Sequence, residues 1–328
     1  MTTPAHEPMT RPTHALPTRP THDKGTGMPT FDTPEPIVAV LDLATATIRI
    51  EAGDRADTVV EVRPSDEHND ADVRAARHTL VEYADGRLLV RSGDDQAGPG
   101  LGWGLSLDKL VESPADWARS LLHGPGSVDV TVSLPAGSSV DARSAAGLRC
   151  RGPLGEVSFT TSYGDIRVER AGRLRLKSTH GEISVTRASG HAEVTTTHGG
   201  IRIGEIDGTA AVRTSHGDVR IGEVTGELRL NSAHGHVTVD RARAGVSART
   251  SYGSVEIGEA TSGSVVMETT GGGLELGIGE GTAAWLDVSS TYGTVDVSLS
   301  PADAPGRTDR TVEVRAHTTY GDIVVHRS

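Results

Sequence analysis

A short motif recurs ten times between Ser144 and Val325, and its spacing constrains the fold of this chain more than any other feature. Each copy has a Ser or Thr, two further residues, a Gly and then alternating apolar residues, as in the stretch Thr214–Ile221. Consecutive motif glycines lie 17, 17, 18, 18, 18, 18, 19, 21 and 28 residues apart. A nearly constant period of this length is typical of a solenoid, in which each copy forms one coil that buries its apolar side against its neighbours. The ten glycines are Gly147, Gly164, Gly181, Gly199, Gly217, Gly235, Gly253, Gly272, Gly293 and Gly321.

Apolar and polar residues alternate on both sides of each motif glycine, which predicts two strands per coil joined at a glycine corner. Equivalent positions in neighbouring copies carry the same kind of side chain, for example Val219, Val237 and Val255. Stacked coils pair in parallel about 4.8 Å apart, so equivalent residues form straight columns. The prediction is an all-β fold, a single-stranded parallel β-solenoid (β-helix) of about ten coils with an N-terminal antiparallel β cap.

The region before the repeats is irregular and is predicted to cover the first coil, whose edge would otherwise expose unpaired backbone groups. Alternating runs in residues 36–63 are interpreted as short antiparallel strands. Asp85-Gly86, between two apolar runs, predicts a β-hairpin with a type I′ turn, which needs positive φ at both central residues.

Composition divides the chain into three predicted parts. Residues 1–33 are rich in Pro, Thr and His and are expected to be a disordered tail, with translation starting at either Met1 or Met28. Residues 34–135 form the cap and include a helical, Trp-containing insertion at 98–126. Residues 136–328 hold the repeats.

The insertion at 98–126 has two interpretations. Ser113-Pro114 is typical of a helix start, and the helix would either pack on the cap or serve as a docking element for a partner or a membrane surface. The candidate partner-binding residues are Trp103, Leu110, Trp117 and Leu121.

Composition narrows the possible functions. Only 35% of residues are hydrophobic and 3% aromatic, so the core is expected to be thin. The net charge of -12 argues against nucleic acid as a partner, because phosphate binding needs clustered Lys and Arg. The single cysteine, Cys150, rules out an internal disulfide and is expected to be a buried small apolar residue. With no apolar run of about 18 residues and no apolar core typical of a signal peptide, no transmembrane segment is expected and the predicted location is cytoplasmic.

Several segments together resemble a known bacterial family. These are PTFDTPEPI, DTVVEVRPSD, VEYADGRLLV, the repeated Gly-Asp-Ile/Val, EGTAAWLDVSS and the final YGDIVV. From about Pro34 to Ser328 the chain is similar to the β-strand-repeat proteins of unknown function often labelled "putative adhesins". The resemblance implies a β-solenoid-like fold and no established catalytic residue. Its label implies surface display, from which this chain departs because no export signal is visible.

Two columns of polar residues mark the predicted corners. A Ser or Thr stands three residues before every motif glycine, and its hydroxyl is expected to point inward and bond backbone groups that the corner exposes. A ring usually stands just before the glycine, and rings at ladder spacing are expected to stack. These ring residues, the predicted structural ladder, are Tyr163, His180, His198, His216, His234, Tyr252, Tyr292 and Tyr320.

The four consecutive histidines, His180, His198, His216 and His234, leave two other roles open. Neighbouring imidazoles can ligate Zn²⁺ or a similar ion, although a ladder spreads its ligands along a line while a tetrahedral site needs them to converge. Alternatively, imidazoles that charge together in acid repel one another, which would destabilise the coils from Gly172 to Gly245. Carboxylates just after the corner glycines, Asp165, Glu182 and Asp218, are expected to offset that repulsion in part.

No motif for catalysis, phosphate binding or dinucleotide binding is present, and no cofactor is expected. The expected function is therefore that of a non-enzymatic scaffold or adhesin-like interaction module for an unknown protein or polymer partner. The alternatives are a metal- or pH-responsive element and an enzyme acting on an extended polymer. Because the last motif copy stops three residues before Ser328, an open parallel edge and end-to-end homo-oligomerisation are also expected.

Overall fold

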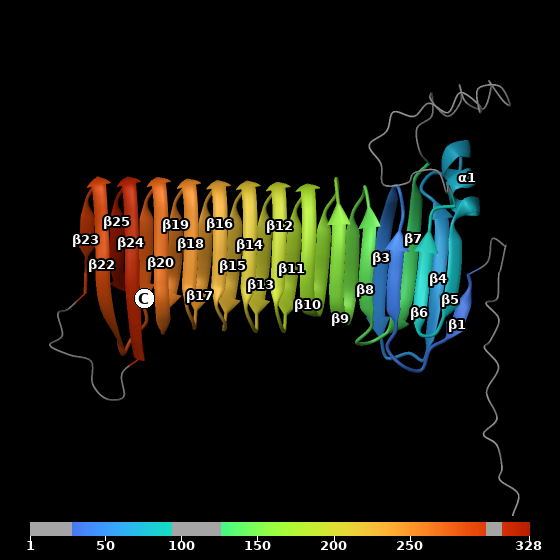
Figure 1. The fold of residues 1–328 in the computed structure, drawn as a ribbon, viewed down its shortest axis with the longest axis horizontal. Coiled ribbons are helices and arrows are strands. Elements are labelled where there is room, and N and C mark those ends of the chain that lie inside the picture. Colours follow the sequence, from blue (N-terminus) through green and yellow to red (C-terminus); the bar gives the residue numbers. More distant parts are fainter. Residues whose placement is uncertain (1–27, 94–125, 300–309) are drawn as a thin grey trace, which may run out of the picture.

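The computed structural model describes residues 28–93, 126–299 and 310–328, which form a long straight solenoid with a cap at one end (Figure 1). Two β-sheets face each other across a thin apolar core. Within each sheet nearly all neighbouring strands are parallel and in register. The predicted all-β solenoid is confirmed. One helix, α1 (Asp70–His78), lies at the capped end.

In the first sheet every strand except the antiparallel β5 runs toward the edge where the motif glycines lie. From the capped end to the other end their spatial order is β5 (Leu80–Ala84), β6 (Arg87–Arg91), β2 (Val38–Asp42), β8 (Ser139–Ser144), the second half of β9 (Leu148–Thr161), the second half of β10 (Ile166–His180), β12 (Ala192–His198), β14 (Ala210–His216), β16 (Leu228–His234), β18 (Val246–Tyr252), β20 (Gly263–Gly271), β24 (Arg310–Tyr320) and β22 (Thr282–Tyr292).

In the second sheet every strand except the antiparallel β4 runs away from that edge. In the same direction their order is β1 (Thr30–Asp32), β4 (Asp57–Pro64), β7 (Val128–Pro135), β3 (Ala46–Gly53), the first half of β9, the first half of β10, β11 (Ile183–Ala188), β13 (Ile201–Ile206), β15 (Val219–Val224), β17 (Val237–Ala242), β19 (Val255–Ala260), β21 (Leu274–Ile278), β25 (Ile323–Arg327) and β23 (Val295–Val297).

The core consists of columns of small and branched apolar side chains. Val219 pairs with Val237 and Val237 with Val255, and each of the three is 1% exposed. The predicted register is therefore confirmed. Because each strand alternates inward and outward residues, every second position adds one more member to a buried column. A chain with few large side chains builds its core in this way from Val, Ile, Leu and Ala.

The corner glycines have two independent reasons to lack a side chain. Gly217 has a φ of +129°, in the region that L-residues other than Gly rarely adopt. A Cβ placed there would also lie 2.3 Å from the carbonyl oxygen of Gly199, the corner glycine of the adjoining coil. The same close approach of one corner to the next recurs from Gly181 to Gly272. Stacking at β-ladder distance therefore requires glycine in this column.

The Ser and Thr residues before the corners bond to backbone groups, as predicted. Thr214 Oγ1 donates to the carbonyl of His216, two residues on, at 3.4 Å, and Ser232 does the same to His234 at 3.2 Å. Other members reach the adjoining corner, as Thr318 does to the carbonyl of Gly272 at 3.0 Å. Most of these hydroxyl residues are buried, so their bonds satisfy polar groups that water does not reach.

The antiparallel cap consists of β1, β4 and β5, which pair antiparallel with β4, β7 and β6. Asp85 and Gly86 both have positive φ, 49° and 73°, which confirms the predicted hairpin turn. The interpretation of all of residues 36–63 as antiparallel strands is wrong, because β2 and β3 form a coil in parallel with its neighbours. Their pairing partners lie far along the sequence, so the local alternation did not reveal their direction.

Helix α1 connects β4 to β5 across the capped end. It begins after Asn69, whose side chain accepts a hydrogen bond from the backbone N–H of Ala71 at 2.9 Å. Asp72 is buried at 6% exposure and accepts bonds from the backbone N–H groups of Asp66 and Ser127. The helix thereby ties the cap to the start of β7.

The last motif copy does not form the far end of the solenoid. β24 and β25 lie between the β20–β21 coil and the β22–β23 coil, so the end is formed by the next-to-last copy (Figure 1). The expectation that the final copy leaves the open edge is therefore wrong. The two lengthened spacings, 21 and 28 residues, provide the extra residues that this order requires. The chain first forms the β22–β23 coil one position further out, and then returns to form the β24–β25 coil in the position between.

Two side chains connect the inserted coil to its surroundings. Asp322 Oδ1 accepts hydrogen bonds from the backbone N–H and the hydroxyl of Thr294, both at 2.8 Å. These bonds favour the ionised carboxylate and hold the pKa of Asp322 below its ordinary value of 3.8. Arg327 donates to the carbonyls of Gly279 and Thr282 at 3.1 and 2.8 Å.

Replacing a corner glycine is expected to destabilise the solenoid strongly. Gly217→Ala combines a strained φ with a backbone clash and should lower the free energy of unfolding by about 2–4 kcal/mol. Gly200→Ala is the matched control, because Gly200 has no positive φ and its nearest contact, the Asp218 carbonyl, would lie 3.6 Å from the new Cβ. Urea denaturation followed by circular dichroism measures both. Equal stability of the two variants would contradict the corner argument.

The Asp322 contact predicts acid-sensitive attachment of the terminal coil. Because the folded pKa lies below the unfolded value, the stabilisation is complete above about pH 4 and is lost as pH falls through the folded pKa. Asp322→Asn should speed amide hydrogen exchange in β23 at neutral pH and remove the dependence of the opening equilibrium on acid. Asp287→Asn, on the exposed side of β22, is the control and should change neither.

Candidate functional site: the ring column

The most regular exposed feature is the row of rings at the corners, which we call the ring column. It comprises the eight residues of the predicted ladder, and the structure brings them together in two runs. In the longer run the ring centroids of Tyr163 and His180 lie 5.1 Å apart, those of the four consecutive histidines 4.9 Å apart, and those of His234 and Tyr252 5.3 Å apart. The shorter run is Tyr320 and Tyr292, 5.0 Å apart.

The rings are stacked nearly face to face. Planes of adjacent imidazoles differ by only 1–5°, and the Tyr163–His180 pair by 9°. Because each face rests on the next ring, the column presents ring edges to solvent. The rings remain well exposed, at 61% for Tyr163 and 65% for Tyr292. The predicted stacking is confirmed.

Local geometry explains where the column stops and starts. A ring residue follows the inward Ser or Thr by two positions and precedes the corner glycine, so it stands on the turn itself. Gly271 interrupts the column, and the Tyr252 ring covers the vacant position, since a Cβ on Gly271 would lie 3.2 Å from Tyr252 Cδ1. Tyr320 precedes Tyr292 in space because the last motif copy is inserted one coil early.

The acidic residues near the corners bond elsewhere than to the imidazoles. Asp165 bonds to Arg167 at 3.0 Å and to the backbone N–H of Glu182 at 3.1 Å. Glu182 pairs with Arg202, and Asp218 accepts from the backbone N–H of His236 at 2.8 Å. Each of the three carboxylates therefore bonds to an arginine or to the backbone of the next coil. None of these contacts brings a carboxylate to a stacked imidazole, so the three carboxylates are not direct counter-ions for a charged ring.

Metal binding by the ring column finds no geometric support. Within residues 28–93, 126–299 and 310–328, no group of three or more His, Cys, Asp or Glu side chains is placed to hold a metal ion. The four histidines are arranged as parallel planes along a line, whereas a tetrahedral site needs three or four nitrogen or sulfur atoms around one point.

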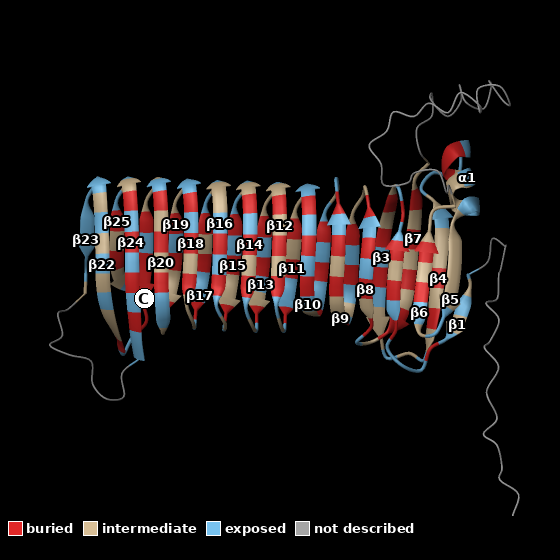
Figure 2. Ribbon diagram, in the orientation of Figure 1, coloured by how far each residue is buried: buried red, intermediate tan, exposed pale blue. Residues whose placement is uncertain are grey.

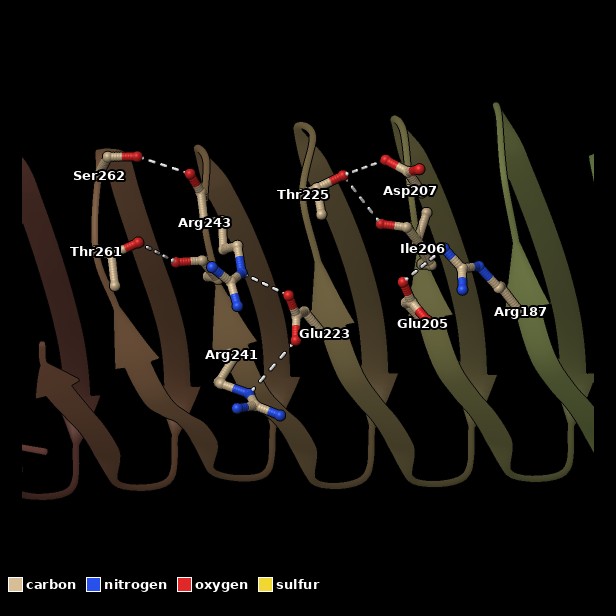
Figure 3. A network of polar contacts seen from close by, with 11 residues as sticks. Arg187, Glu205, Ile206, Asp207, Glu223, Thr225, Arg241, Arg243, Thr261 and Ser262 are labelled. Carbon is tan, nitrogen blue, oxygen red and sulfur yellow. Dashed lines mark hydrogen bonds and ion pairs between the residues drawn. The ribbon is translucent and has the colours of Figure 1, made fainter.

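The opposite edge of the coils carries a network of polar contacts (Figure 3). Glu223 pairs with both Arg241 and Arg243, and Glu205 pairs with Arg187 at 3.1 Å. Hydroxyls continue the network at the turns, where Thr225 donates to Asp207 at 3.0 Å. Each contact joins one coil to another.

This network is the described part of the chain that most resembles a catalytic cluster. A glycosidase-type mechanism requires one carboxyl that donates a proton and a second that acts as base or nucleophile. Glu205 and Glu223 are ladder neighbours, but guanidinium groups engage both of them. The arrangement stabilises the stacking of the coils and does not provide the two distinct carboxyl environments of an acid–base pair.

Two shallow hollows lie on the first coils. One of about 270 Å³ lies at the first corners and is lined by Leu43, Arg143 and Thr161 among others. Another, of about 160 Å³, is lined by Arg49, Glu51, Arg149 and Arg151. Pockets that enclose a drug-sized ligand usually measure about 300–1,000 Å³. Neither hollow is large enough to enclose such a molecule.

The other sequence candidates divide between the described and undescribed residues. Cys150 is 2% exposed, as predicted, and burial raises the pKa of its thiol, which disfavours the reactive thiolate. Trp103, Leu110, Trp117 and Leu121 lie outside the described residues. None of the described helices could span a bilayer.

Sequence reasoning missed one exposed apolar surface, at the far end of the solenoid. Val295 and Val297 in β23 are 42% and 40% exposed, although they occupy inward positions. Nothing in their local sequence distinguishes them from buried valines. The signal that could have revealed them is the pair of lengthened spacings around Gly293. At this point the order of the coils in space begins to differ from their order in the sequence.

The chain is similar, at low sequence identity, to solved structures from several bacteria. A "putative adhesin" from Bacteroides fragilis is 12% identical, with 93% of this chain and 98% of that chain covered and a TM-score of 0.34. A "putative adhesin" from Parabacteroides merdae is 11% identical, with coverage of 92% and 96% and a TM-score of 0.38. A "putative cell adhesion protein" from Clostridium sporogenes is 9% identical, with coverage of 92% and 99% and a TM-score of 0.20.

No curated protein matches this chain. The model of one protein family matches residues 39–328, which include nearly all of the β2–β3 coil, the cap strands β4 and β5 and every motif copy. The matched region begins within β2, in agreement with the structural finding that the coils start there and not at the first motif glycine. The chain belongs to the Toastrack DUF4097 family.

Proposed function

We propose that this chain is a non-enzymatic interaction module that binds a protein or polymer partner along its ring column. The observation that carries the proposal is the column itself, a straight row of exposed rings at a repeat of about 5 Å on a rigid support. Tyrosine and histidine edges offer hydrogen-bonding groups beside apolar surface, a combination that is enriched at binding interfaces for tyrosine. A partner with a regular repeat can engage several rings at once.

The regularity of the support favours binding over catalysis. Neighbouring coils are held by backbone ladders and by inter-coil ion pairs, so exposed groups in one column keep fixed spacing. A rigid surface binds without the entropy cost of ordering mobile side chains. Many weak, equally spaced contacts add together when a partner spans several coils.

The column is expected to be required for partner capture. The test variant has Tyr163, Tyr252, Tyr292 and Tyr320 changed to Ser. In affinity capture from native cell extract it should bind less partner than the parent chain by a factor of about ten or more, because each interfacial Tyr contributes about 1–2 kcal/mol to binding. The control is a variant with four exposed residues on the outer faces of the sheets, Thr160, Lys177, Arg220 and Asn231, changed to Ala. Equal capture by both variants, or capture of no specific partner by the parent, would reject the proposal.

A second function, a response to acid, is favoured by the face-to-face stack of four histidines. Histidine gains its charge between about pH 8 and pH 5, and charging adjacent rings 4.9 Å apart adds repulsion to the folded state only. The unfolded chain separates these rings, so acid lowers the free energy of unfolding. Loss of these coils would change the ring column and hence release a bound partner.

Replacing all four histidines with tyrosine isolates this effect, because tyrosine already occupies both ends of the run and stays neutral in this pH range. The parent chain should lose more thermal stability between pH 7.5 and pH 5 than the four-tyrosine variant. The melting temperature, followed by circular dichroism, reports the difference. Parallel pH profiles for the two proteins would show that the imidazole stack is not a proton sensor.

A further inference from the structure

We infer that the end of the solenoid formed by β22 and β23 is a docking surface for a second copy of this chain. The surface, here named the open end, consists of the inward residues Ala284, Leu286, Val288, Val295 and Val297. It lies at the opposite end of the molecule from the cap (Figure 1). The inference is independent of the ring column and its proposed partner.

The open end exposes positions that are core positions in every other coil. The register partners of Leu286, Val295 and Val297 in the adjoining coil are Val314, Ile323 and Val325, which are at most 1% exposed. At the end itself Val295 and Val297 are exposed, and Leu286 is half-buried. Figure 2 shows the change, since the red bands of the inner coils give way to tan and pale blue in β22 and β23.

The backbone of the open end is also unpartnered on one side. Among the described residues, β22 pairs with β24 and β23 pairs with β25, and no strand lies beyond them. An edge of this kind offers a row of N–H and C=O groups to another strand. Soluble proteins usually protect long edges with charges or prolines, and β22 has one charged residue, Asp287, in its 11 residues and no proline.

The sequence of β22 is complementary to itself. A two-fold axis through Leu286 would place two copies of β22 antiparallel, with Ala284 opposite Val288 of the second copy. In the same register Asp287 would lie opposite Trp285, and so the two Asp287 carboxylates would not face each other. Trp285, 68% exposed on the outer side, would gain cover from the second copy.

Two further observations favour a second copy as the occupant. The chain that leaves the open end, residues 300–309, contains two prolines and two alanines but no larger apolar residue, so it supplies little to bury Leu286 or Val295. At the capped end the outermost strands, β1 and β5, have only 3 and 5 residues, and α1 packs against β4, so this end has no long unprotected edge like that of β22. With one open end per chain, association stops at a pair and does not continue into a filament.

The oligomeric state of the full chain tests the inference. Sedimentation equilibrium should give twice the 34.3 kDa mass of one chain at high concentration, in a concentration-dependent equilibrium. Leu286→Lys and, separately, Val297→Lys should each shift the protein to the monomer by weakening association at least about 100-fold, because each places a charge in the apolar interface. Glu256→Lys, a charge reversal on the outer side of the inner strand β19, is the control and should remain dimeric.

Hydrogen exchange distinguishes loss of docking from loss of the terminal coil. In both Lys variants the amides of β24 and β25 should stay protected, while those of β22 should exchange faster than in the dimer. A parent chain that is monomeric at all concentrations, a Lys variant that remains dimeric, or masses that grow beyond the dimer would each overturn the inference. A monomeric protein whose β22 amides are protected would also contradict the inference, because residues of the same chain would then cover the open end.

Discussion

The close approach of consecutive corners governs this structure. Parallel strands in register place equivalent atoms about 4.8 Å apart, and at the corners this leaves no room for a side chain between Gly199 and Gly217. The glycine column permits the turn, the turn sets the direction of both strands, and the strands align the apolar columns. The buried Ser and Thr residues complete the corner by satisfying its backbone carbonyls, at Thr214 as at Thr318.

The in-register stacking of the coils also determines how exposed side chains are arranged on the surface. When the same residue type recurs at one motif position, its side chains form a row whose spacing equals the distance between neighbouring strands. The stacked rings from Tyr163 to Tyr252 are the clearest case, and the arginine–glutamate contacts around Glu223 are another. Rows of like groups are favourable for rings and unfavourable for charges. The ladder neighbours Glu205 and Glu223 each pair with an arginine of an adjoining coil.

Much of the coil was predictable, because the repeat makes each local pattern visible ten times. The inward column through Val219 and Val237, the buried hydroxyls, the stacked rings and the hairpin at Asp85-Gly86 each depend on residues close together in sequence or on the period itself. The direction of β2 and β3 was not predictable from local sequence, because their parallel pairing with β8 and β9 depends on residues about a hundred positions away in the chain. The contacts of Asp165, Glu182 and Asp218 likewise depend on side-chain reach across coils. The exposed valines of β23 depend on coil order, which local patterning does not encode.

The insertion of β24 and β25 between earlier coils affects how this end of the molecule assembles. β22 and β23 are synthesised first, yet their only described partners come later in the chain. Addition of coils one after another, which is natural for a repeat protein, therefore cannot build this end. Either β22 waits unpaired until β24 emerges, or it first occupies the place beside β20 and is then displaced. Completion of the solenoid is thus a strand-exchange or gap-filling event, and it should be slower than the growth of the regular coils.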